Sequence, residues 1–227
     1  MVINPDSLGR TLDSLNEAFF FHDPISDADR DAVVCWIAGR HGDSTASEGY
    51  LFAPTEQDYA DGVALFTGER VHAEPNVKYV LGLEALHALT LLGPPTAAAR
   101  AAIAQASGYA TRLLSEREAN GAQMGSYRCA ACTRALWRCI AAGSIRGKEA
   151  WLEEGLRELK ECRTLDGSWH SAPYYYTLLT LLEIGEPAHG ELKYAVPRAE
   201  RLLRRLKQDD PISCRRRVLL QRTLSMC

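Results

Sequence analysis

A segment that recurs after 42 residues is the feature that most restricts how this chain can fold. The stretch from Gly125 to Gly143, GSYRCAACTRALWRCIAAG, aligns with the stretch from Gly167 to Gly185, GSWHSAPYYYTLLTLLEIG. Both copies open with glycine, serine and an aromatic residue, continue as an apolar helical run and stop at glycine. A looser copy joins EGYLF at 48–52 to YVLGLEALHALTLLG, with an insertion between them. Repeats of this length indicate stacked helical hairpins, because a single hairpin cannot bury its apolar face alone.

Helical periodicity extends over most of the chain, and strand-like alternation is nearly absent. Two segments have one apolar stripe and one charged face, as outer helices do: EAWLEEGLRELKEC and PRAERLLRRLKQ. Two others are apolar most of the way round: YYYTLLTLLEIG and CAACTRALWRCIAAG. The chain therefore alternates amphipathic outer helices with apolar inner ones. The predicted helices are roughly 6–21, 28–41, 74–93, 96–119, 128–142, 147–163, 172–185, 191–208 and 211–224.

Length and composition fit one globular α/α-repeat domain over residues 1–227, with 46% apolar and 24% charged residues. A long irregular insertion covers about 42–73 and has room for a short helix near 56–66. The longest apolar runs are too short for a membrane span, and the N-terminus does not have the design of a signal peptide. The odd number of cysteines, seven, then favours reduced thiols and a cytoplasmic location over a disulfide framework.

Positive charge gathers in the C-terminal hairpin, at about 191–227. The net charge of the whole chain is −3, but this hairpin holds ten Lys and Arg residues against four Asp and Glu residues. A basic C-terminal hairpin of this kind can bind a phosphate group or an acidic partner. The alternative is that its charged residues form a solvated helix face. Because Tyr194 is its only aromatic residue, a nucleic-acid-binding module is not expected.

The order of amphipathic helix, Gly-x-aromatic turn, apolar helix and glycine resembles the prenyltransferase and squalene-oxidase repeat of the terpenoid cyclase and protein prenyltransferase superfamily. RTLDGSW and AQMGSY are degenerate versions of that family's Gln…Gly-x-Trp turn, with Gln123 as the one matching glutamine. The resemblance covers about residues 28–225 and implies an all-α fold, an α/α toroid whose inner helices surround an apolar cavity. The family's cyclisation motif, Asp-x-Asp-Asp, does not occur in the chain, which argues against a protonation-driven terpene cyclase.

About four hairpins plus a lone first helix are fewer than the six hairpins of a closed toroid. We therefore expect a partial ring that leaves an apolar flank open. Such a flank favours a homo-oligomer or a partner subunit.

Cysteine and histidine occur at the starts of the two repeated helices. Cys129 and Cys132 begin the first helix, and His170 lies one period later, before the second. Protein prenyltransferases hold zinc at inner-helix starts with Asp, Cys and His, so the resemblance makes these three residues candidate zinc ligands. Zinc takes about four N, S or O ligands, and the family's Asp-x-Cys pair is missing here. The competing interpretation is that the cysteines are buried core thiols.

Aromatic residues of the repeat are the candidates for ligand binding. Three successive tyrosines are about 100° apart around a helix, so at least one of them must face the interior of the ring. On a cavity wall they would suit an isoprenoid or aromatic ligand, and in a core they would only pack. The candidates are Tyr174, Tyr175, Tyr176, Trp169, Tyr127, Trp137 and Arg128.

Two charged clusters have simpler explanations than a binding site. Arg215, Arg216, Arg217 and Arg222 could hold a diphosphate, but adjacent arginines point in different directions, as on any surface helix. Asp23, Asp27, Asp29 and Asp31 precede or begin a helix, where carboxylates favour the positive helix end, so we interpret them as caps.

These patterns favour a protein that binds a small apolar molecule, with an isoprenoid as the leading candidate, in a central pocket. Transferase or lyase chemistry would be in keeping with the family, although the sequence identifies no catalytic residue. The alternative is a non-catalytic helical-repeat scaffold that binds a protein partner. The apolar inner helices favour the pocket, and the missing catalytic acids favour the scaffold.

Overall fold

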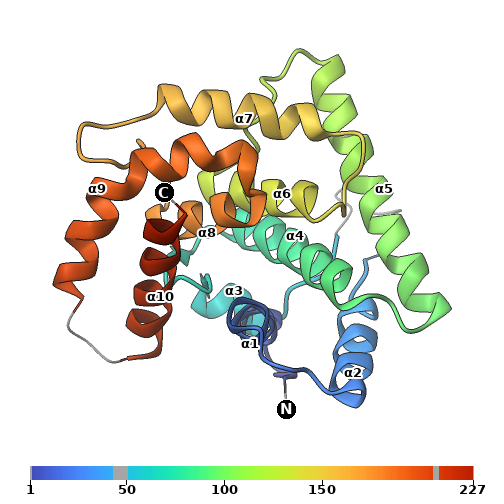
Figure 1. Cartoon of the computed structure of the whole chain (residues 1–227). Helices are drawn as coiled ribbons and strands as arrows, with labels where there is room; N and C mark the ends of the chain where they lie inside the picture. Colours follow the sequence, from blue (N-terminus) through green and yellow to red (C-terminus); the bar gives the residue numbers. More distant parts are fainter. Residues whose placement is uncertain (1, 43–50, 207–209, 227) are drawn as a thin grey trace.

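The computed structural model describes residues 2–42, 51–206 and 210–226, and every long helix predicted from the sequence has its counterpart there (Figure 1). The elements are α1 (Leu8–Phe21), α2 (Asp27–Ala38), α3 (Glu56–Asp61), β1 (Val63–Ala64), β2 (Arg70–Val71), α4 (Glu74–Leu92), α5 (Ala97–Ala119), α6 (Ala130–Ala141), α7 (Glu149–Glu161), α8 (Tyr174–Ile184), the 3-10 turn η1 (Glu186–Ala188), α9 (His189–Arg205) and α10 (Pro211–Ser225). The all-α prediction is therefore confirmed. No helix within the described ranges is long and apolar enough to cross a membrane.

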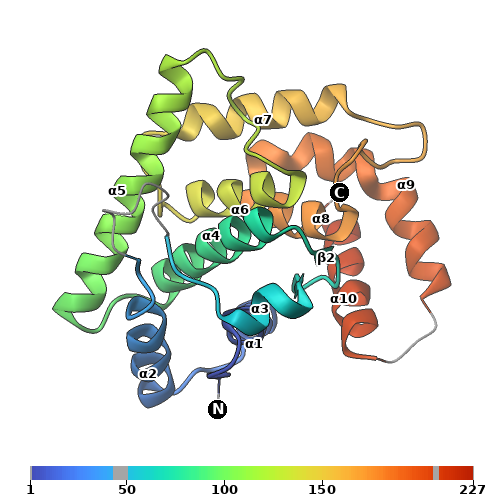
Figure 2. The ribbon, with the colours of Figure 1, turned by 180° about the vertical axis from the view of Figure 1, so that it is seen from behind.

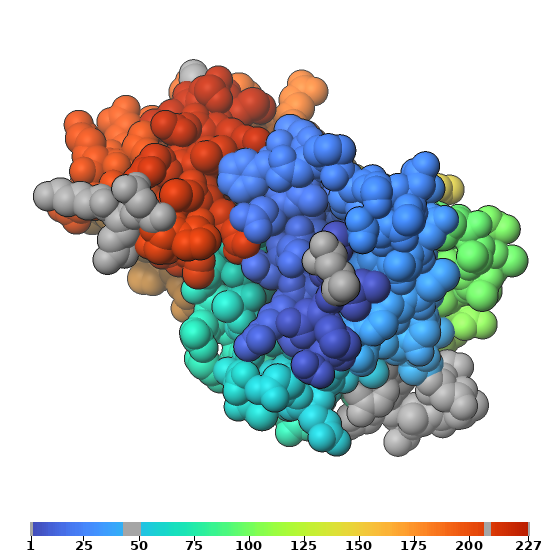
Figure 3. Space-filling model, turned by 90° about the horizontal axis from the view of Figure 1, so that it is seen from below, coloured from blue at the N-terminus to red at the C-terminus, as the bar shows by residue number. Residues whose placement is uncertain are grey.

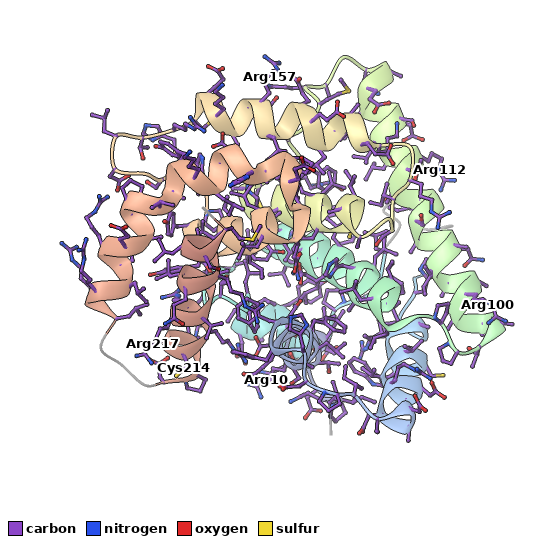
Figure 4. All side chains as sticks on the ribbon, viewed as in Figure 1. Arg10, Arg100, Arg112, Arg157, Cys214 and Arg217 are labelled. Atoms are coloured by element: carbon purple, nitrogen blue, oxygen red, sulfur yellow. The ribbon has the colours of Figure 1, made fainter. Side chains whose placement is uncertain are left out.

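Helices α1, α4, α6, α8 and α10 form an inner ring, and α2, α5, α7 and α9 lie outside it (Figures 1 and 2). α6 packs between α4 and α8, α1 packs on the other side of α4, and α10 on the other side of α8. The outer helices carry exposed charged side chains, such as Arg100 and Arg112 on α5 and Arg157 on α7 (Figure 4). This alternation of inner and outer helices is the one that the repeat predicts.

Neighbouring inner helices run in the same direction. The thiol of Cys132 lies 3.9 Å from the carbonyl oxygen of Asn76, and the thiol of Cys139, two turns later, donates to the carbonyl of Leu83 at 3.0 Å. Because these contacts advance together along α6 and α4, the two helices are parallel. Their C-terminal ends therefore lie at the same end of the ring.

The ring closes within one chain. Arg215 of α10 donates to Asp13 of α1 at 2.7 Å and to Glu17 of α1 at 3.0 Å. Farther along, the guanidinium of Arg222 lies 4.1 Å from the ring centre of Phe20. Figure 3 shows α10, in red, against the N-terminal helices, in blue. Side chains of the last inner helix therefore reach the first inner helix, where the sequence predicts an open flank.

The described part of the insertion, residues 51–73, packs on the N-terminal end of the ring. Asp58 of α3 accepts the backbone N–H groups of Leu8 and Gly9, at 3.0 and 3.1 Å, where α1 begins. Glu69 accepts the N–H of Tyr176 at 3.0 Å in the first turn of α8. Carboxylates are stabilising at helix N-termini, where N–H groups have no partner within the helix. The insertion thus covers the N-terminal end of the ring.

The glycines of the repeated turn have similar φ angles in both copies. Gly125 and Gly167 have φ values of 88° and 84°, and the helix-ending Gly143 and Gly185 have 75° and 77°. Residues with a Cβ are strained in this left-handed region, which explains the glycines at these positions. The indole N–H of Trp137 donates to the carbonyl of Gly125 at 2.9 Å and ties the turn to α6.

Close packing of α7 on Trp137 gives a test of the fold. A Cβ added at Gly155 of α7 would lie 2.2 Å from the buried Trp137 ring, whereas at Gly108 of α5 it would meet nothing within 4 Å. We expect Gly155→Ala to lower the free energy of unfolding by about 2 kcal/mol because the indole has no room to move. Gly108→Ala should raise it by about 0.5 kcal/mol through helix propensity. Urea unfolding followed by circular dichroism measures both, and equal effects would contradict this packing.

Candidate functional site

A polar network fills the centre of the ring, where an apolar cavity is expected from the sequence. Arg138 of α6, 1% exposed, donates at 2.6 Å to both carboxylate oxygens of Glu84 on α4. It also donates to Glu183 of α8 at 2.6 and 2.8 Å and to Asn16 of α1 at 2.9 Å. Tyr176 of α8 donates its hydroxyl to Glu84. One guanidinium therefore joins side chains from α1, α4 and α8, and its five N–H donors all have acceptors.

The charges of this network remain in place at neutral pH. Burial raises the pKa of Glu84, but the charge of Arg138, together with His87 and the hydroxyl of Tyr176, outweighs burial and lowers it. Burial likewise lowers the pKa of Arg138, whereas Glu183 and Glu84 raise it well above its ordinary value. The network is thus a buried ion pair with a second carboxylate, and removing one partner would leave the other charge uncompensated.

His87 lies beside this network, 3% exposed, with its Nε2 3.8 Å from a carboxylate oxygen of Glu183. Burial lowers its pKa to about 4, and the charge of Arg138 adds to that effect, against the opposite influence of Glu183 and Glu84. The imidazole is therefore neutral at pH 7 despite the nearby carboxylate. Its Nδ1 is buried and has no hydrogen-bond partner among the described residues.

A cavity of about 610 Å³ lies over the network at the C-terminal end of the ring, and every inner helix contributes to it. Its walls are mostly apolar and include Phe19, Phe20, Leu91, Leu179, Leu182 and Met226. Asn16, His87, Arg138 and Glu183 form a polar floor, and Arg222 adds a cation from α10. Leu91 and Met226 are 49% and 46% exposed, which is unusual for large apolar side chains.

The backbone gives this cavity a negative potential. Residues at or next to the last turn of each inner helix line it: His22, Leu91, Ala142, Glu183 and Ser225. A helix C-terminus carries roughly half a negative charge on its unpaired carbonyl groups, and here the helices present these ends together. Because the side-chain charges of the floor largely compensate one another, a neutral or cationic ligand is favoured over an anion.

The three successive tyrosines do not line this cavity. Tyr176 does face the interior of the ring, as helical geometry requires, but it is a member of the polar network. Tyr174 donates to the carbonyl of Ala195 in α9 at 3.2 Å, and the ring of Tyr175 lies 4.2 Å from the guanidinium of Arg216 in α10. Their spacing around α8 sends them to three different neighbours, so they do not form one ligand-binding surface.

The other predicted ligand-binding residues also lie away from the central cavity. Trp169, in the turn before α8, donates to Glu191 of α9 at 2.9 Å, and Tyr127 is buried near Tyr79, with ring centres 5.9 Å apart. Trp137 and Arg128 line a smaller pocket beside the start of α6. These aromatic side chains hold the repeat together and do not form the walls of the central cavity.

The structure does not assemble the predicted zinc site. In the described chain no group of three His, Cys, Asp or Glu side chains is arranged to hold a metal ion. The Sγ atoms of Cys129 and Cys132 are 2.9 Å apart, and His170 lines the same small pocket as Cys129, but His170 does not join the two thiols in a metal-binding arrangement. Helix α6 begins at Ala130, but α8 begins only at Tyr174, so His170 remains in the preceding turn. The aligned sequences therefore do not occupy equivalent places in space.

The arginine cluster is only partly a surface helix face, since Arg215 is 7% exposed, and the acidic cluster lies at a helix start. Arg215 pairs with α1, Arg216 donates to the carbonyl of Thr67 at 2.8 Å, and Arg217 lies at the start of α10 near Cys214 (Figure 4). They do not converge on one anion. In the acidic cluster, the hydroxyl of Ser26 caps α2, and Asp27 and Asp29 occupy its first turn, which confirms the interpretation for these two residues. Asp31 lies beyond the first turn and accepts from Arg30 at 3.3 Å.

The smaller pocket, about 170 Å³, is lined by Cys129, Cys162 and the buried Arg134, among others. Arg134 is 6% exposed, donates to Thr177 at 3.2 Å and lies 4.1 Å from the ring centre of Trp137. Burial lowers its pKa to about 10, so it is charged at pH 7. The contact between the two thiols lowers the pKa of Cys129 to about 6, while the same contact and burial raise the pKa of Cys132.

Sequence reasoning missed the residues of the polar floor. Inner helices that look nearly uncharged contain Glu84 and His87 three positions apart, Arg134 and Arg138 four positions apart, and Glu183 near a helix end. A charged residue inside an otherwise apolar helix is buried at a high energetic cost unless it is paired. That rule is the signal that could have identified the network.

The chain matches no model of a known protein family, no curated protein and no solved structure. The resemblance to the terpenoid cyclase and protein prenyltransferase superfamily therefore rests on the repeat pattern alone.

Removal of one charge from the network should destabilise the protein. We expect Glu84→Gln to lower the free energy of unfolding by about 3 kcal/mol, because Arg138 would keep its buried charge with only one carboxylate. Urea unfolding at pH 7 measures the change. The exposed pair Glu154–Arg157 supplies the control, since Glu154→Gln should have no measurable effect. Equal results for the two variants would contradict a structural role of the network.

His87 should make the fold sensitive to acid. Its pKa is about 4 in the folded protein and about 6.5 when unfolded, so the unfolded chain binds the proton more readily. Stability is therefore fully present above pH 6.5 and falls toward pH 4, by up to about 1.4 kcal/mol per pH unit. His87→Gln should have a shallower decline over this window, measured by urea unfolding at a series of pH values. Identical slopes would show that His87 is not neutral in the fold.

Proposed function

We propose that this protein binds one small, neutral, largely apolar molecule in the cavity at the C-terminal ends of its inner helices. The observation that carries the proposal is a cavity of about 610 Å³ whose apolar walls come from every helix of the inner ring. Small-molecule sites commonly have about 300–1,000 Å³, mostly apolar walls and a few polar groups that orient the ligand. The cavity combines these properties.

The charges around the cavity support a neutral ligand. Arg138 already has an acceptor for each N–H group, so the floor gains nothing from a further anion. The helix ends add negative potential, which disfavours phosphate groups. Arg222 counters one negative charge, and its guanidinium lies over the ring of Phe20. A hydroxyl group at the floor is compatible with these surroundings, whereas a diphosphate is not.

An isoprenoid alcohol is the ligand that we place first, because the repeat resembles that of proteins that handle isoprenoids. The proposal is binding without covalent chemistry. Glu183 is the carboxylate among the described residues that line the cavity, and two hydrogen bonds from Arg138 hold it. It is therefore poorly placed to act as the strong acid that starts a cyclisation.

A second candidate function is favoured by the mouth of the cavity. Leu91 and Met226 expose about half of their surface there. Apolar side chains at a rim can also contact a protein partner or a second copy of the chain. In that case the cavity would accept a side chain of the partner in place of a free ligand.

The test is titration calorimetry with farnesol and with farnesyl diphosphate. Ala141, exposed at the end of α6, lines the cavity, and Ala98, exposed on α5, does not. We expect farnesol to bind with one site per chain, and Ala141→Trp to weaken it at least about tenfold, or 1.4 kcal/mol, by filling the cavity. Ala98→Trp should leave the affinity unchanged.

Tighter binding of the diphosphate, or equal affinity of the native protein and Ala141→Trp, would contradict the proposed site. Failure of farnesol to bind, together with a dimer that Leu91→Asp dissociates in light scattering, would favour the second candidate.

A further inference from the structure

Cys129 and Cys132 form a thiol pair that the central cavity does not use. Their Sγ atoms are 2.9 Å apart, and the Sγ of Cys129 accepts the backbone N–H of Cys132 at 3.3 Å as the N-cap of α6. A helix N-terminus stabilises negative charge, so this position favours the thiolate of Cys129. Cys129 is half-buried and reachable, whereas Cys132 is fully buried behind it.

This arrangement sets the pair apart from the other thiols of the described chain. Cys139 is fully buried and donates to the carbonyl of Leu83 at 3.0 Å, and Cys35 and Cys162 are exposed. Among the described residues, the contact between Cys129 and Cys132 is the one hydrogen bond between two thiols. One reachable thiol with a second thiol directly behind it is the arrangement that exchange reactions require.

A pocket with a buried cation lies beside the reachable thiol of Cys129. Cys129 and Arg134 both line this pocket of about 170 Å³. Arg134 donates to the hydroxyl of Thr177 and faces the ring of Trp137, and it makes no ion pair with a carboxylate of the described chain. The carboxylate of Glu158 lines the same pocket and attracts Arg134 without forming a direct ion pair. A ligand carboxylate that reaches the guanidinium would form the direct pair that Glu158 does not make. Guanidinium pairs well with a carboxylate.

We propose that Cys129 and Cys132 are a redox-active dithiol that exchanges with a small disulfide bearing carboxylates, which Arg134 holds in this pocket. The inference does not depend on ligand binding in the central cavity, because the two pockets share no residue. It assigns an activity, thiol–disulfide exchange, to the start of α6.

The exchange has two steps. The thiolate of Cys129 attacks one sulfur of the disulfide R–S–S–R, forming a bond to that sulfur and releasing RS⁻. Cys132 gives its proton to the released thiolate and attacks the Sγ of Cys129, which breaks the mixed disulfide and releases the second RS⁻. The protein loses two electrons and two protons as it forms the Cys129–Cys132 disulfide, and the small disulfide takes them up to become two thiols.

The experiment uses oxidised glutathione, which bears carboxylates, and the neutral 2-hydroxyethyl disulfide. The protein carries serine in place of the cysteines outside the pair, except for the buried Cys139. Intact-mass measurement should show a loss of about 2 Da and one internal disulfide. Cys132→Ser should stop at a mixed disulfide with one glutathione, and Cys129→Ser should not react. Reaction of Cys129→Ser at the native rate would overturn the proposal.

Arg134 is tested by the difference between the two disulfides. We expect Arg134→Met to slow the reaction with oxidised glutathione at least about tenfold, or 1.4 kcal/mol, and to leave the rate with 2-hydroxyethyl disulfide unchanged. A general loss of folding would slow or speed both reactions together, and circular dichroism detects it directly. Arg134→Lys keeps the charge and should restore part of the rate with glutathione. Equal slowing with both disulfides would refute the role of Arg134 in holding the carboxylate.

Discussion

The ion pair of Arg138 with Glu84 holds the inner ring together from its centre. Arg138 brings α6 into contact with α1 through Asn16, with α4 through Glu84 and with α8 through Glu183. Apolar packing would allow these helices to slide along one another, whereas a guanidinium with five directed donors fixes their register. Register in turn decides which side chains reach the end of the ring. The cavity therefore depends on a buried ion pair, of which Arg138 is part of its floor.

The two ends of the ring have different chemistry because the helices are parallel. N–H groups without partners gather at one end, and the insertion supplies the carboxylates of Asp58 and Glu69 to them. The C-terminal ends of the inner helices gather at the other end, where the cavity lies. Residues 51–73 of the insertion are thus a structural component of the ring. The start of α6 differs, because a small pocket lies beside Cys129 there.

The sequence predicts the elements of this fold well and its site poorly. Hydrophobic periodicity locates the helices, and the glycines at Gly125 and Gly167 identify equivalent turns, because both signals are local. Glu84 and Arg138 are 54 residues apart and meet only because α4 and α6 are parallel neighbours in the correct register. Alignment of the repeats also misplaced His170, because α8 begins later than the period implies. Local patterns do not contain such long-range geometry.

The contact between Arg215 and Asp13 joins residues 202 positions apart, nearly the whole length of the chain. A chain growing from its N-terminus on the ribosome therefore makes α1, α4, α6 and α8 before it can complete the ring. Until α10 emerges, the carboxylates on α1 have no cationic partner and one wall of the cavity does not exist. Assembly of this protein should thus end in a single late, cooperative step. A chain interrupted before α10 should form an open array of helices, and not a ring with a smaller cavity.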